Sequence, residues 1–448
     1  MPRYLITSYL ALLFCLPLPF ASVYTWGWAF FGGCSFVLLA LVLLAKVKAQ
    51  LVSKAPSLEL PTAFVRSIPV LILLMAVQLI VFLQWLLGSY DAFQDLLQGL
   101  GLCAFFALTL LLLTDKTSIE RAIWVVIIAA GFQALYGSLM VMTGLEWSFF
   151  AEKWAYLGKA TGTFVNRNHL AGYLEMTLAL GIGFLLASST RYSGDWQQRL
   201  RQFIEVLLSP KVVMRLTLGI MVIGLVMTRS RMGNTAFFAS LMIAGGLALL
   251  LMKNKSRSTT ILLSSLLIID IAIVGTFFGV EKVAERLQSS SINKESRDEV
   301  SRDTFNMWLD NPLLGTGAGS YKYAYPSYKS DDVTIFRIYD YAHNDHLQFL
   351  AEFGAIAFLL LAIAVALVFY WSLQAMRLRQ RSLNQGLGFA SCMAIIAIMI
   401  HSTVDFNLQI PANAFMFVFM LAMGCIARWT PSGSRSSGSG SGRRRRSK

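Results

Sequence analysis

The stretch that decides the fold runs from Ser67 to Leu87 and reads SIPVLILLMAVQLIVFLQWLL, without one charged side chain. A hydrocarbon core about 30 Å thick is crossed by about 20 apolar residues in a helix, so this stretch predicts a membrane span. The composition agrees, because 56% of the 448 residues are hydrophobic and 14% are charged, with a mean hydropathy of +0.61. Soluble domains carry about 25% charged residues. The sequence therefore predicts an integral membrane protein.

Further apolar runs on both sides of this stretch predict an all-α protein with about 12 transmembrane helices. The predicted spans are Tyr4–Phe20, Trp26–Ala45, Ser67–Leu87, Phe93–Thr114, Ala122–Thr143, Leu170–Ser188, Leu216–Thr228, Thr235–Met252, Thr259–Val280, Leu347–Leu373, Gly386–Ile400 and Ala412–Ala427. We expect four regions: spans 1–9 within residues 1–280, a polar loop domain with short helices at 281–346, spans 10–12 at 347–427, and a disordered basic tail at 428–448.

The distribution of Lys and Arg predicts the orientation, because basic residues are retained on the cytoplasmic side of a membrane. With the N-terminus inside, 25 of the 38 basic residues fall in cytoplasmic segments, and eight of the other 13 lie in the long polar loop. We therefore expect both termini in the cytoplasm and the 281–346 loop in the periplasm of a bacterial inner membrane.

Charge and cysteine content exclude several classes of protein. The net charge of +14 is explained by basic residues that flank apolar spans and meet anionic headgroups, so no nucleic-acid partner is predicted. All five cysteines lie inside apolar spans without a CxxC spacing, which supports neither a disulfide framework nor a zinc site. We predict no cofactor and no metal.

Residues able to do chemistry gather on the predicted outer side. Arginine clusters suit phosphate groups, because the guanidinium stays charged and binds oxyanions with two hydrogen bonds. A histidine that titrates near neutral pH is a plausible general base. The residues concerned are Asn166, Arg167, Asn168 and His169 before span six, Arg229 and Arg231 after span seven, Arg297 and Arg302 in the loop, and His343, Asn344, His346, His401 and Asp405 around spans ten and eleven.

The long loop contains two recognisable patterns. Residues 295–308 (ESRDEVSRDTFNMW) predict a helix, on which Arg297 and Arg302 diverge by about 140°, so that only one of them faces a given site. The alternative for each arginine is a surface ion pair with a neighbouring acid. The glycine-rich run 312–321 (PLLGTGAGSY) lacks the Gly-Lys-Ser/Thr ending of a phosphate loop, and we interpret it as a tight turn.

Two further segments place histidines near the outer ends of spans. In AHNDHLQFLAEFG (342–354), His343 is a candidate base, a polar anchor, or a metal ligand sharing one helical face with His346. In HSTVDFNLQIP (401–411), Asp405 orients His401 if the helix continues; otherwise the segment is an interfacial cap. The carboxylates of Glu175 and Asp270 lie inside spans and must face protein or a cavity.

Taken in order, five segments resemble the motifs of the O-antigen ligase superfamily, which includes O-antigen ligases, polysaccharide polymerases and protein O-oligosaccharyltransferases. They are GTFVNRNHLAGYL (162–174), TRSRMG (228–233), R-x14-PLLGTGAGSY starting at Arg297, AHNDHLQFLAEFG and HSTVDFNLQIP, and they span residues 162–411. The resemblance implies a GT-C-like multi-span glycosyltransferase that takes a glycan from undecaprenyl diphosphate at the periplasmic face.

Residue by residue, the resemblance assigns Arg231 and Arg297 to the donor diphosphate, with Arg229 and Arg302 beside them, and His343 to the proton of the acceptor hydroxyl. The implied reaction is metal-independent and inverts the anomeric centre. The acceptor would be a glycan or a lipid A–core, which leaves ligase and polymerase open, with ligase favoured. A lipid-linked glycan transporter or flippase, suggested by Asp270, and a non-catalytic membrane scaffold are the alternatives from other classes.

Overall fold

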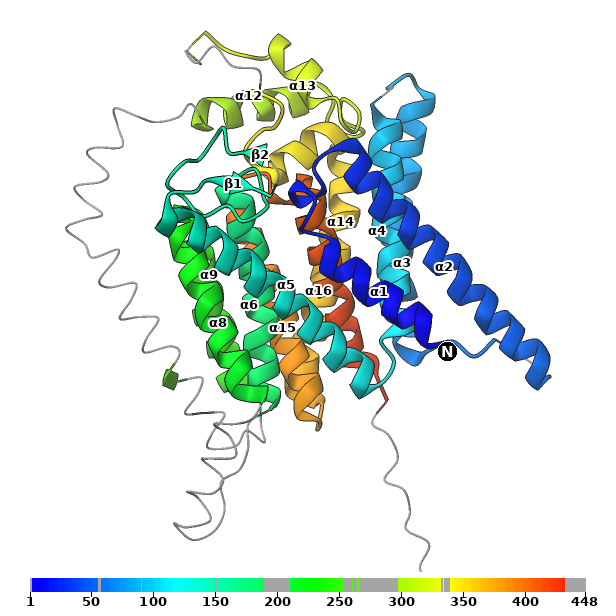
Figure 1. Ribbon diagram of the computed structural model, residues 1–448. Coiled ribbons are helices and arrows are strands. Elements are labelled where there is room, and N and C mark those ends of the chain that lie inside the picture. The colour runs from blue at the N-terminus through cyan, green and yellow to red at the C-terminus, as the bar shows by residue number, and fades with distance from the viewer. Residues whose placement is uncertain are drawn as a thin grey trace, which may run out of the picture.

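The computed structural model describes residues 2–54, 58–89, 91–149, 151–188, 210–252, 260, 264–265, 297–331, 333 and 339–431. These residues form thirteen α-helices, three short 3-10 helices and one two-stranded hairpin (Figure 1). The predicted helical class is therefore confirmed. Most of the predicted span Thr259–Val280, including Asp270, and residues 432–448 of the basic tail lie outside the described residues.

Nine helices of the described residues are long and apolar enough to cross a membrane, which makes the chain a multi-pass membrane protein. They are α2 (Thr25–Ser53), α3 (Thr62–Leu86), α4 (Ala92–Leu112), α5 (Lys116–Thr143), α6 (Arg167–Ala187), α9 (Arg231–Leu251), α14 (Asp345–Leu378), α15 (Ser382–His401) and α16 (Pro411–Trp429). Each coincides with one of the predicted spans.

Two predicted spans form shorter helices, α1 (Arg3–Cys15) and α8 (Pro210–Met227). The first was expected to reach Phe20, but α1 ends at Cys15. Pro17 and Pro19 follow at once, and proline cannot donate the backbone hydrogen bond that would continue a helix. The chain passes instead through the 3-10 helix η1 (Phe20–Ser22) into α2.

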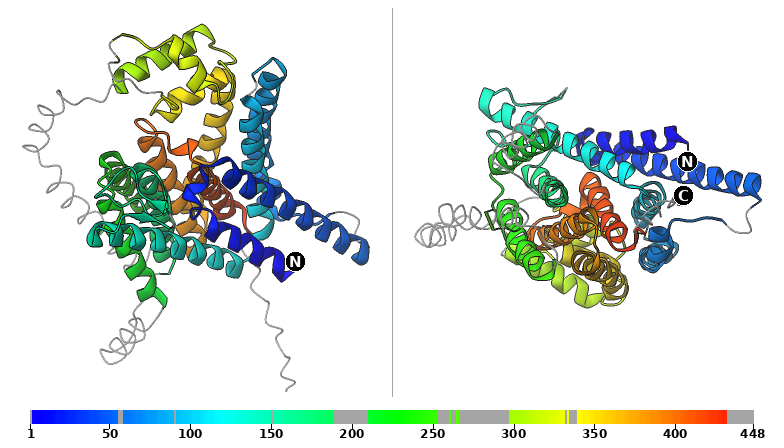
Figure 2. Two further views of the ribbon diagram at one scale, coloured as in Figure 1. Left: turned by 45° about the horizontal axis from the view of Figure 1, so that its top comes forward. Right: turned by 90° about the horizontal axis from the view of Figure 1, so that it is seen from below.

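The centre of the bundle is built from α6, α15 and α16, which are the most buried spans. Helices α6 and α15 approach so closely that a Cβ on Gly183 would collide with the carbonyl oxygen of Gly386. By contrast, α2, α3 and α14 are the least buried spans, and the second half of α2 extends away from the other helices (Figures 1 and 2). Because the central helices pack tightly, the residues at their ends have fixed positions relative to one another.

One end of the bundle carries the short elements. These are the hairpin β1 (Trp147–Ser148) and β2 (Ala151–Glu152), the loop helix α12 (Arg297–Asp310), α13 (Tyr321–Ala324) and the 3-10 helix η2 (Tyr325–Ser327) (Figure 1). The predicted loop helix corresponds to α12. Its buried side chains Val300 and Met307 pack with Tyr321, Ala342 and Ala351, so α12 is fixed over the beginning of α14.

Candidate active site

The ring of Phe406 lies where three of the motif segments meet. Its centroid is 4.6 Å from the ring of His169 and 4.9 Å from the ring of His343, both in edge-to-face geometry. Tyr341 stacks on the same ring at 4.4 Å. Burial raises the pKa of Tyr341 to about 12, so its hydroxyl is neutral at physiological pH. These contacts join the start of α6, the segment before α14 and the loop after α15.

Asp405 is held by the first turn of α6. Asn168 Nδ2 donates to Asp405 Oδ2 at 2.5 Å, and His169 Nε2 lies 3.5 Å from Asp405 Oδ1. Burial raises the pKa of this carboxyl, but the nearby His169, the charge of His401 and the hydrogen bond from the Phe406 amide outweigh it, and the pKa falls well below its usual range. The orientation of His401 by Asp405 required the helix to continue, but α15 ends at His401 and the turn that follows directs Asp405 to α6.

His401 has a different partner. Its Nδ1 donates to Glu175 Oε1 at 2.8 Å, and both side chains are fully buried. The prediction that the Glu175 carboxylate faces protein is therefore confirmed. The pair joins α6 to the end of α15 inside the bundle.

Asp345, the first residue of α14, binds the loop that follows α15. The Asp345 carboxylate accepts hydrogen bonds from Ser402 Oγ at 2.6 Å and from the backbone N–H of Leu408 at 3.0 Å. The Asp345 amide donates to the Ser402 carbonyl at 3.0 Å. Residues 402–410, which include η3 (Asn407–Gln409), are thus held against the segment that carries His343.

His343 and His346 do not share a helical face, which corrects the sequence-based expectation. Helix α14 begins at Asp345, so His343 precedes it, with a left-handed backbone of φ 52°. Such a conformation is uncommon for a residue other than glycine. The half-buried His343 ring packs on Phe406, whereas His346 Nε2 donates to the carbonyl of Met399 at 3.0 Å.

Two of the predicted support residues, Asn166 and Asn344, are helix caps. Asn166 Oδ1 accepts the backbone N–H two residues later at 2.9 Å, and Asn344 Oδ1 accepts the one three residues later at 3.1 Å. Such caps satisfy backbone donors that a helix leaves unpaired. They determine where α6 and α14 begin, and therefore where His169 and His343 lie.

Arg229 and Arg231 flank the turn between α8 and α9. Both side chains are exposed, and Arg229 has a left-handed φ of 53°. Ser230 caps α9, because its Oγ accepts from the Gly233 amide at 3.2 Å. Arg167 Nη1 donates to the Arg229 carbonyl at 3.0 Å. The TRSRMG turn and the NRNH segment are therefore in direct contact.

The two loop arginines differ in what the structure describes. Arg297 is the first residue of α12, and its side chain lies outside the described part of the structure. Arg302 Nη2 donates to Ser330 Oγ at 2.7 Å and lies 3.3 Å from Asp303 Oδ1. The surface ion pair considered for Arg302 is thus formed.

The glycine-rich turn is a structural element, as predicted. The amide of Thr316 donates to the Ala351 carbonyl at 2.9 Å, and that of Gly317 donates to the Glu352 carbonyl at 3.0 Å. These two amides are engaged with α14, whereas a phosphate loop presents its amides to the phosphate. The turn closes the base of the loop domain.

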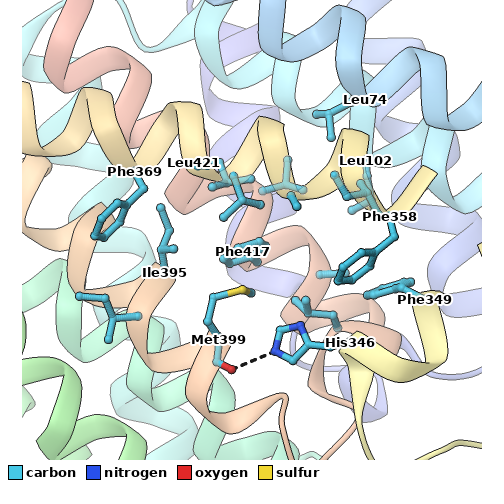
Figure 3. Close-up of a pocket in the computed structure, with 18 of the residues that line it drawn as sticks. Leu74, Leu102, His346, Phe349, Phe358, Phe369, Ile395, Met399, Phe417 and Leu421 are labelled. Atoms are coloured by element: carbon cyan, nitrogen blue, oxygen red, sulfur yellow. Dashed lines mark hydrogen bonds between the residues drawn. The ribbon is translucent and has the colours of Figure 1, made fainter. Parts of the chain in front are cut away.

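An apolar cavity of about 740 Å³ lies beside this end of the bundle (Figure 3). Residues of α3, α4, α9, α14, α15 and α16 line it, among them Leu74, Phe358 and Phe417. His346, three residues after His343, is one of the lining residues. From Phe358 to Phe369 the lining follows α14 for about 16 Å.

The roles of Phe406 and Asp345 were not predicted from the sequence. An aromatic residue in a polar turn carries no signal of its own, because its role depends on segments that fold against it from 60 residues or more away along the chain. The helix start at Asp345, just after the potential cap Asn344, was the available clue.

Comparison with known protein families matches residues 216–362 to the family described as O-antigen ligase. This region is about a third of the chain and contains the TRSRMG turn, α12, the glycine-rich turn and His343. No curated protein matches the chain. Residues 216–362 are thus similar to the O-antigen ligase family, in agreement with the resemblance of the sequence motifs.

Proposed function

We propose that the protein is an O-antigen ligase that transfers a glycan from undecaprenyl diphosphate to a hydroxyl of lipid A–core at the periplasmic face. The observation that carries this proposal is the continuous set of contacts from Arg229 through Arg167 and the start of α6 to Phe406 and His343. A diphosphate-binding turn and a candidate base thereby belong to one cluster.

The backbone at both ends of this set of contacts supports a functional role. Arg229 and His343 adopt left-handed φ values of 53° and 52°. Strained backbone costs about 1–3 kcal/mol and persists where surrounding structure enforces it, commonly at active sites. Here the capped starts of α9 and α14 enforce it.

The cavity supports a lipid-linked donor. Its volume of about 740 Å³ falls within the roughly 300–1,000 Å³ of ligand pockets. Because the lining is almost wholly apolar and α14 is the least buried span, a polyprenyl chain entering from the bilayer would bury its surface there. Its diphosphate would then lie toward His346 and the neighbouring His343.

In the proposed reaction, the acceptor hydroxyl oxygen attacks the anomeric carbon while the bond to the diphosphate breaks. His343 accepts the hydroxyl proton, and the electron pair leaves with undecaprenyl diphosphate. Arg231 and Arg297 neutralise the charge that develops on the leaving group, which is the role that preorganised cations play in transfer reactions. A single displacement inverts the anomeric centre.

The test is transfer from an undecaprenyl-linked glycan to purified lipid A–core. We expect His343→Ala to lower the rate by about 10²–10⁴-fold, as the loss of a general base does. Arg231→Ala should lower it by about 10²–10³-fold. Arg121→Ala is the matched control. Arg121 is also exposed, but it lies near the N-terminal end of α5, whereas the hairpin beside the candidate site follows the C-terminal end of that helix.

Three outcomes decide the assignment. Dependence of lipid A–core glycosylation on both residues supports the ligase. Lengthening of the lipid-linked glycan, with no transfer to lipid A–core, replaces the ligase with a polymerase. Transfer that continues undiminished in both correctly inserted variants overturns the proposed site.

A further inference from the structure

The buried pair of Glu175 and His401 takes no part in the proposed chemistry. The two residues are 226 positions apart in sequence, are joined at 2.8 Å, and are both 0% exposed. Burying a carboxylate opposite a histidine is costly, and removing one partner leaves the other unpaired. The pair therefore carries a desolvation cost, and it lies at a single point between α6 and α15.

That point is also where the first turn of α9 rests. A Cβ on Gly233 would lie 3.1 Å from Glu175 Oε1 and 2.6 Å from Ala171 Cβ. Because Gly233 has no side chain, the turn packs directly on Ala171 and beside the Glu175 carboxylate. Arg231 is two residues earlier in the same turn. A negative group beside the start of α9 is also favourable, because a helix N-terminus carries partial positive charge.

Neither partner has a substitute among the described residues. Glu175 Oε2 and His401 Nε2 are buried and make no hydrogen bond within that part of the chain. The carboxylates of Asp405 and Asp345 act on His401 only through their charge. Loss of either member would thus leave the other buried without a partner at the point where α6, α15 and the first turn of α9 meet.

We propose that Glu175 and His401 are positioning residues for Arg231. The pair fixes the first turn of α9 against α6 and α15, and so sets where Arg231 stands relative to the His343 segment. This inference rests on the proposed function, because it takes Arg231 to bind the donor diphosphate. It assigns Glu175 and His401 no contact with substrate.

The test is a double-mutant cycle read as binding of undecaprenyl diphosphate to the full-length protein. Glu175→Gln keeps the shape of the side chain but removes its charge, and we expect it to weaken the affinity about 10-fold, the order of effect of a displaced binding group. In an Arg231→Ala background the same change should add less than about twofold. Acceptor KM should stay at the wild-type value.

Two further variants separate positioning from general damage to the fold. The exchange Glu175→His with His401→Glu rebuilds the pair in reverse and should restore most of the affinity. Tyr9→Phe is the matched control. It removes another fully buried hydrogen bond between helices that are far apart in sequence, the one between Tyr9 and Thr109 at 2.7 Å. We expect no change in donor affinity in this control.

Equal losses from Glu175→Gln with and without Arg231 overturn the positioning role, and so does wild-type affinity in Glu175→Gln. If Glu175→Gln does not fold, the variant with Glu175→His and His401→Glu is the test. If that variant folds but does not recover donor affinity, the positioning role is overturned. Full glycan transfer by Arg231→Ala alone instead overturns the proposed function.

Discussion

Asp405 shows how a residue that contacts no substrate in the proposed reaction can hold the site together. Its carboxylate ties the loop after α15 to Asn168 and His169 of α6, and its neighbour Phe406 contacts His343. The side chain is 2% exposed, so its charge is compensated by these partners rather than by water. An ionised Asp405 therefore stabilises the folded state.

The lowered pKa of Asp405 predicts a specific dependence of stability on pH. Because the pKa is lower in the folded than in the unfolded protein, the stabilisation is fully present above the unfolded value of about 3.9 and is lost as the pH falls toward the folded value. Asp405→Asn should cost about 3 kcal/mol near neutral pH. Thermal melts in detergent from about pH 6 down to about pH 3 measure this effect.

The comparison between wild type and variant isolates Asp405 from other carboxylates. The difference in melting temperature should be largest near neutral pH and should shrink as the pH falls below about 4. A difference that stays constant over the whole range would show that the Asp405 charge does not contribute.

At the scale of elements, the interruption of α14 explains the glycine-rich turn. Gly354 has φ 76° inside α14, so carbonyls before the break and amides after it lose their helical partners. The turn replaces them: Thr316 and Gly317 donate to the carbonyls before the break, and the Ala355 amide donates to the Pro312 carbonyl at 2.9 Å. Helix and turn therefore form one hydrogen-bonded unit.

Gly354→Ala should disrupt this unit. An added Cβ would meet the Leu313 carbonyl, and the φ of 76° is strained for alanine. We expect a loss of about 1–3 kcal/mol in stability and reduced glycan transfer. Size-exclusion chromatography and thermal melts of the detergent-solubilised variant measure the first effect. Gly33→Ala in α2, where a Cβ meets nothing within 4 Å, is the control and should be neutral; equal behaviour of the two variants would contradict the role of the turn.

At the scale of the whole molecule, much of the bundle could be predicted from hydropathy. A span must satisfy its backbone hydrogen bonds and match the bilayer thickness, and both constraints leave a signal along the sequence. Nine of the twelve predicted spans therefore coincide with helices long enough to cross. Proline shortened α1, and the break at Gly354 was not predicted, since one glycine in an apolar run gives no sign of the turn that packs on it.

The partners within the candidate site were less predictable. Spacing suggested His401 with Asp405, but helix α15 ends at His401, and the partners are Glu175 with His401 and His169 with Asp405. Contacts between residues more than 200 positions apart depend on how helices pack, which spacing along one helix does not encode. Helix starts were more accessible, because Asn166 and Asn344 are recognisable caps.

The cavity gives a prediction for the whole molecule, because residues of six helices line it. Ala362 and Ala366 on α14 line the cavity and are exposed. Phenylalanine at either position should fill space needed by a long polyprenyl chain. Since each buried CH₂ contributes about 0.8 kcal/mol, displacing even two should raise the donor KM about 10-fold. Steady-state transfer from an undecaprenyl-linked donor measures this change.

A geranyl-linked donor distinguishes a filled cavity from a damaged site. Its short chain leaves most of the cavity empty, so Ala362→Phe should raise KM for the undecaprenyl donor much more than for the geranyl donor. Ala11→Phe is the control, because Ala11 is an exposed residue of α1 that does not line the cavity, and both donors should keep their wild-type KM. If Ala362→Phe raised KM equally for both donors, the chain would bind elsewhere, and the cavity would not be the part of the bundle that recognises the lipid.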